Sequence, residues 1–172
     1  QMVRTALDPF HFDLRILTGL GLYPVVLLGL FDAKDADRQA KRVHDWLVED
    51  EVPARIVEPG PAMSPDDVES IRGTILGNTI PIVSLESARD TTTDGRFNLL
   101  STLAGRLGTR KVIFLSPSSG LEREGAPRIA DVNLSLDYER LLGARGQLAP
   151  RHYTLLRQVR DLLHEVPQRM SV

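Results

Sequence analysis

The chain has 172 residues, of which 42% are hydrophobic and 26% charged, so it is long enough to bury a core in one domain. Its net charge of −2 gives no electrostatic reason to expect nucleic acid or an anionic membrane as a partner, and we expect neither. The absence of cysteine excludes disulfides, thiolate zinc sites and cysteine nucleophiles.

The first half of the chain alternates between helix-like and strand-like segments. Apolar runs bounded by Gly and Pro indicate strands, and apolar residues at three- and four-residue spacing indicate amphipathic helices. Ser64 is a good helix start, because its hydroxyl can cap backbone N–H groups and acids follow it. In chain order the pattern predicts a helix at 8–18, a strand at 23–28, a helix at 33–49 whose first residues 35–38 are solvated, and a strand at 52–57. A helix at 64–77 and a strand at 79–85 follow, and then a polar segment at 86–95 whose run 91–95 is a turn or a short hairpin tip.

The most informative stretch is 95–121. A helix with one apolar stripe is expected to end at Gly108, where glycine is a common stop. The apolar run 112–115 then predicts a central parallel strand, buried on both faces beside the strands at 23–28 and 79–85. Beyond it the pattern predicts a short strand at 129–132, helices at 134–142 and 150–166, and the start of a strand at 170–172.

Strands that alternate with helices predict a parallel sheet covered on both faces. We therefore expect an α/β fold, a three-layer α/β/α sandwich with a mainly parallel sheet. The order of the strands cannot be derived from the pattern. The loop 116–120 would follow the carboxyl end of a strand, where open α/β sheets place their ligand sites.

Four segments resemble motifs of the amino acid kinases. Residues 23–29 (YPVVLLG) are similar to the family's early P-V-V-V-H-G strand, and 79–83 (TIPIV) to its G-x-I-P-V-I strand. Residues 103–121 (LAGRLGTRKVIFLSPSSGL) resemble A-x-x-L-x-A-x-K-L-I-F-L-T-D-V-P-G-V, and 147–151 (QLAPR) falls where the family has G-M-I-P-K. The resemblance implies an amino acid kinase-like fold over 1–172. That domain would be incomplete, without the first strand and most of the nucleotide-binding half.

Within that superfamily the chain most resembles the kinase-like domain of N-acetylglutamate synthases, especially the eukaryotic type. The similarity lies in residues 27–30, 112–115, 120–121 and 131–134. It implies a regulatory and oligomerisation domain of an acyltransferase of arginine biosynthesis. The acetyl transfer itself, with acetyl-CoA, would belong to a C-terminal acetyltransferase domain that these residues do not contain, so the fragment itself would need no cofactor.

Departures from the kinase motifs argue against phosphoryl transfer. Leu30 and Phe31 stand where the active family has phosphate-approaching glycines, and we expect them to crowd a phosphate. Phe97 stands where the active family has an acidic residue. A shift of the alignment would put Asp94 in that place instead, which leaves an altered site open. We therefore expect no catalytic residues in this fragment.

Ligand-binding candidates fall in three places. Asp94 and Arg96, with Asp90, could line an acyl-amino-acid site or simply form a polar turn. Ser116 and Ser118 belong to a loop that could bind an anion through N–H groups or only connect two elements. Arg151 keeps a cation where the family has Lys; it can bind an anion but cannot transfer a proton. The four histidines have no metal-ligand spacing, so no metal site is expected.

Three functions remain open. The first is the inactive kinase-like domain, the second an active acetylglutamate kinase that uses ATP and Mg²⁺, and the third a stand-alone α/β interaction module. The resemblance implies self-association, through the helix at 33–49 or that at 64–77, a C-terminal acetyltransferase domain as partner, and arginine as an effector. The alternative for the stripe of Val68, Ile71 and Ile75 in the second helix is that it only faces its own sheet. It also implies the mitochondrial matrix if the source is eukaryotic, and the cytoplasm otherwise.

Overall fold

The computed structural model describes residues 12–115, 150–166 and 171–172. The predicted loop 116–120, strand 129–132 and helix 134–142 lie outside the described residues, as do Met170 and the start of the first predicted helix. The chain folds into two compact units, Gln1–Leu107 and Gly108–Val172.

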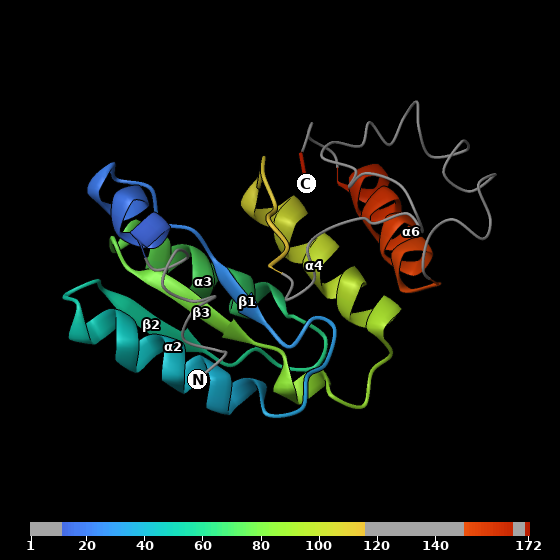
Figure 1. The fold of residues 1–172 in the computed structure, drawn as a ribbon, viewed down its shortest axis with the longest axis horizontal. Helices are drawn as coiled ribbons and strands as arrows, with labels where there is room; N and C mark the ends of the chain where they lie inside the picture. The colour runs from blue at the N-terminus through green and yellow to red at the C-terminus, as the bar shows by residue number, and fades with distance from the viewer. Residues whose placement is uncertain (1–11, 116–149, 167–170) are drawn as a thin grey trace, which may run out of the picture. The chain divides into compact units, whose positions relative to one another are not determined.

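The first unit alternates strands and helices in the predicted order (Figure 1). Residues 12–19 are helical and precede the first strand. The elements that follow are β1 (Val26–Leu28), α2 (Ala36–Glu49), β2 (Ala54–Val57), α3 (Pro65–Leu76), β3 (Ile80–Ser84), a short 3₁₀ helix η1 (Glu86–Ala88) and α4 (Thr93–Leu107). The strands are shorter than predicted at their starts; Pro24 and Pro53 lie just before β1 and β2, and proline has no N–H to give to a ladder.

The three strands form one parallel sheet in the order β1-β3-β2. Ile82 in β3 is in register with Val26 of β1 on one side and with Ile56 of β2 on the other. The sheet confirms the predicted α/β class and its parallel pairing. It also supplies the strand order, which the sequence pattern leaves open.

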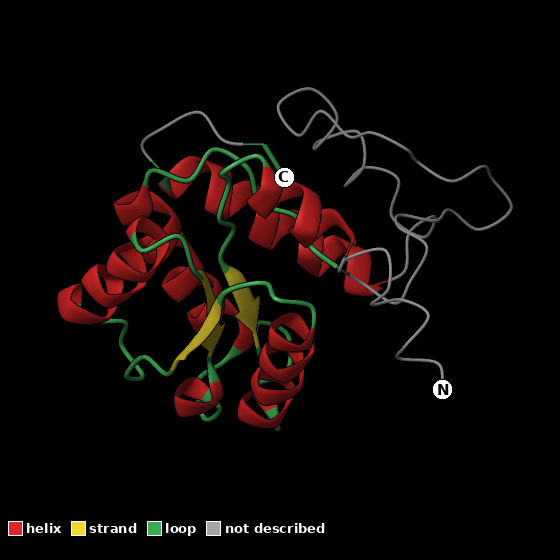
Figure 2. Ribbon diagram, turned by 90° about the vertical axis from the view of Figure 1, so that its left-hand side faces the viewer, coloured by secondary structure: helices red, strands yellow, loops and turns green. Residues whose placement is uncertain are grey.

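Helices cover both faces of this sheet (Figure 2). All five residues of β3 are buried, which requires cover on both sides. Ile80 and Ile82 share one hydrophobic cluster with Ala40, Val43 and Leu47 of α2. α3 also packs on β3, with Val68, Ile71 and Thr74 buried along its length.

The apolar stripes of α2 and α3 therefore serve the unit's own core. Val68 and Ile71 are 2% and 0% exposed, and Ala40 and Leu47 of α2 are fully buried. The sequence suggested these two helices as self-association surfaces, but these buried residues face the unit's own core and are not exposed for a partner.

α3 begins with the predicted cap. The Ser64 hydroxyl accepts a hydrogen bond from the Asp67 N–H at 3.2 Å, and the Asp67 carboxylate accepts one from the Ser64 N–H at 2.7 Å. This reciprocal pair is a capping box, and it satisfies two backbone donors that a helix start leaves open. Nearer the end of α3, the Arg72 guanidinium donates a hydrogen bond to the Arg106 carbonyl at 2.6 Å. This bond joins α3 to the last turn of α4.

The predicted turn or hairpin tip at 91–95 is wrong for residues 93–95, which are helical. Residues 86–88 form η1, and Thr93, Asp94 and Gly95 already belong to α4. The Gly95 N–H donates to the Thr92 hydroxyl at 3.1 Å, so a local side chain receives one of the free donors of the new helix. The Thr-rich run is a helix start rather than a turn.

The predicted central strand at 112–115 is also wrong. In the second unit, Lys111 forms a single parallel bridge with Ser171, and residues 112–115 are not in a strand. Ile113 and Leu115 are 68% and 59% exposed, so the run is not buried on both faces. A central strand needs a continuous ladder on each side, and one bridge does not provide it.

The second unit also contains α6 (Pro150–Glu165), which confirms the predicted helix there. Leu156, Val159 and Leu162 are buried along it. Within the described residues, no helix is long and apolar enough to cross a membrane.

Candidate functional site

The carboxyl ends of the three strands lie at one edge of the sheet, because the strands are parallel. Open α/β sheets bind their ligands at this edge. The chain leaves it through residues 29–35 after β1, 58–64 after β2 and 85–92 after β3. The Ser87 hydroxyl donates to the Pro59 carbonyl at 2.6 Å and joins the last two of these connections.

The connection after β1 lies tightly against the start of α2. Gly29 has φ +89°, a left-handed conformation that favours glycine. A Cβ on Gly29 would lie 3.0 Å from the Cβ of Ala36 and 3.2 Å from the Cα of Ala33. The glycine and the two alanines therefore let the backbone of this turn approach the first turn of the helix.

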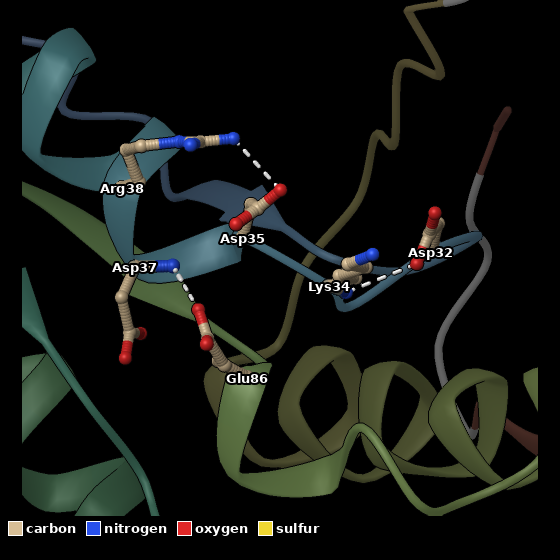
Figure 3. Close-up of polar contacts among 6 residues, drawn as sticks. All are labelled: Asp32, Lys34, Asp35, Asp37, Arg38 and Glu86. Carbon is tan, nitrogen blue, oxygen red and sulfur yellow. Dashed lines mark hydrogen bonds and ion pairs between the residues drawn. The ribbon is translucent and has the colours of Figure 1, made fainter.

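Three polar residues close a ring of hydrogen bonds at this helix start. The Asp37 N–H donates to the Glu86 carboxylate at 2.8 Å (Figure 3), and the Ser84 hydroxyl donates to the Asp37 carboxylate at 2.5 Å. The Glu86 N–H donates back to the Ser84 hydroxyl oxygen at 3.3 Å. The ring joins the end of β3 to the first turn of α2.

The carboxylate of Glu86 occupies the place where such a helix start would hold an anion. Free N–H groups and the helix dipole make a helix N-terminus attractive to phosphate or carboxylate groups. Here the first-turn donor of Asp37 already has a protein carboxylate as its acceptor. An external anion would have to displace Glu86 to use that N–H.

The remaining polar groups of the α2 start make local contacts (Figure 3). The Lys34 N–H donates to the Asp32 carboxylate at 3.0 Å, and Arg38 pairs with Asp35 at 2.7 Å. Asp35 sits at the N-cap with φ 63°, and its side chain makes no capping hydrogen bond. The predicted solvated start at 35–38 is correct for the Asp35–Arg38 pair and for Asp37, which is exposed although it takes part in the ring with Ser84, and wrong for Ala36, which is fully buried.

Arg96 is buried and bound to the protein backbone. Its guanidinium donates to the carbonyls of Leu30 at 2.9 Å and Phe31 at 3.0 Å, to the Thr93 hydroxyl at 3.2 Å, and to the Thr91 carbonyl. Only 6% of the residue is exposed. Four of its five N–H donors are therefore engaged. The two bonds to Leu30 and Phe31 hold the connection after β1 against the start of α4, and the two to Thr91 and Thr93 are local to that helix start.

The two aromatic residues of this region pack together. Phe31 meets Phe97 edge-on, with ring centroids 5.8 Å apart and an interplanar angle of 63°. Phe97 is 4% exposed and Leu30 is 7% exposed. Leu30 thus lies in the core, and Phe31, which is 48% exposed, is the apolar side chain that the connection after β1 presents to solvent.

The predicted site residues do not all fall in the described part of the chain. Asp94 is exposed and lies two positions before the buried Arg96 in the first turn of α4. Asp90 is exposed in the turn before that helix. Arg151 lies in the first turn of α6, in the second unit, and Ser116 and Ser118 lie outside the described residues.

The ring residues Ser84, Asp37 and Glu86 were not among the predicted site residues. Asp37 is 47 residues from Ser84 and 49 residues from Glu86 in sequence, and no short sequence motif indicates a contact over such a separation. The one sequence signal is that Ser84 ends an apolar run predicted to be a strand. A hydroxyl buried there, as Ser84 is, needs a hydrogen-bond partner.

His152 is another buried polar residue that the sequence analysis did not predict to be buried. It is 5% exposed in the first turn of α6, and neither ring nitrogen has a hydrogen-bond partner among the residues that the structure describes. Across the described residues, no group of three or more His, Asp or Glu side chains could hold a metal ion.

The chain was compared with family models, curated proteins and solved structures. No family model, no curated protein and no solved structure matches the chain.

Proposed function

We propose that this chain is a catalytically inactive, kinase-like regulatory and oligomerisation domain of the N-acetylglutamate synthase type. The proposal joins the motif resemblance to the geometry of the sheet's carboxyl edge. The observation that carries it is the Asp37 N–H bound to the Glu86 carboxylate at 2.8 Å. A phosphate-binding helix start needs that donor to be free.

Two further contacts support the lack of phosphoryl transfer. Arg96 is a buried cation near this edge, and four of its donors go to protein oxygens rather than to a ligand. Phe31 and Phe97 bring an apolar pair to the segments where kinase chemistry needs an acid and close backbone approach. Phosphoryl transfer depends on positioned cations and donors, and these side chains are otherwise engaged.

We expect the chain to neither bind MgATP nor phosphorylate N-acetylglutamate. The measurement is calorimetric titration with MgATP, followed by an ATP-dependent assay with N-acetylglutamate and a no-enzyme control. Glu86→Ala is the matched variant, because it frees the Asp37 N–H without touching the apolar pair. We expect it to remain without kinase activity even with that N–H free, because Arg96 stays bound to protein oxygens and the Phe31–Phe97 pair stays in place. Phosphorylation by the unmodified chain above the control would overturn the proposal in favour of an active kinase.

The regulatory part of the proposal implies self-association, a C-terminal acetyltransferase domain and a response to arginine. Light scattering at micromolar concentration should give a mass above that of one chain, and a clean monomer would remove the assembly role. A gene that encodes an acetyltransferase domain downstream of these residues would support the synthase assignment. A gene without one would favour a stand-alone interaction module.

A further inference from the structure

We draw no further inference here: the strongest candidate, the exposed apolar patch of Phe12 and Ile16 on the helix before β1 and Leu20 in the turn after it, carries nothing because no observation among the described residues shows what covers it.

Discussion

Two apolar runs of this chain look alike in sequence and differ in the fold. Ile80–Ser84 and the run 112–115 are both short and rich in β-branched or aromatic residues. The first forms β3, which is paired on both sides and completely buried. The second has one bridge at Lys111, and Ile113 in its middle is 68% exposed. An apolar run becomes a central strand only where two neighbouring ladders and two covering layers meet it.

A matched pair of truncations tests this comparison most strongly. Ile82→Ala should lower the free energy of unfolding by about 2–5 kcal/mol, because Ile82 is fully buried and its removal leaves a cavity. Ile113→Ala should cost less than about 0.5 kcal/mol, as for other exposed positions. Urea unfolding followed by circular dichroism measures both. Equal losses for the two variants would show that 112–115 is a buried strand after all.

Arg96 tests whether the carboxyl edge is held by protein contacts. Arg96→Met should lower the free energy of unfolding by about 2–3 kcal/mol, since it leaves the carbonyls of Leu30, Phe31 and Thr91 without this donor. Arg89→Met is the control, because Arg89 is exposed in the turn before α4. If both variants unfolded at the same denaturant concentration, the guanidinium contacts would not hold the edge together.

The two helix starts at this end of the sheet provide a smaller test. Ser64→Ala should cost about 1 kcal/mol, because it breaks the capping box of α3. Asp35→Asn at the start of α2 should change stability by less than about 0.5 kcal/mol, since asparagine tolerates the left-handed backbone at φ 63° and the Asp35 side chain makes no cap and only an exposed ion pair with Arg38. A larger loss at Asp35 than at Ser64 would contradict the difference between the two caps.

The capping box should also depend on pH. The Ser64 hydroxyl and the N–H groups of Ser64 and Gly60 donate to the Asp67 carboxylate and hold its pKa below the ordinary value, against a smaller opposing effect of burial. A lowered folded-state pKa stabilises the protein above the unfolded pKa of about 3.9, and this stabilisation is lost as the pH falls through the folded value. The protein should therefore lose free energy of unfolding as the pH falls from about 5 to about 3, and Asp67→Asn should make this loss smaller. Unfolding curves at the two pH values, with Asp66→Asn as the exposed control, measure the difference. Identical pH dependence in the two variants would exclude a contribution from the box.

Local chemistry determined much of the first unit. Ser64 followed by acids predicted the start of α3, and alternating apolar periods predicted α2, β3 and the parallel sheet, because propensity, capping and pattern agree there. Arg96 was named as a candidate from its position, but its role as a donor to the connection after β1 was not predicted. That role depends on carbonyls 65 and 66 residues away in sequence.

Only the tertiary structure decided the order of the strands, the exposure of 112–115 and the ring of Ser84, Asp37 and Glu86. Each depends on which segments meet across long sequence separations. A parallel strand is paired through crossover connections, so its neighbours are not its neighbours in sequence. The Glu86 carboxylate reaches the start of α2 because β3 lies at the centre of the sheet, and no local pattern places it there.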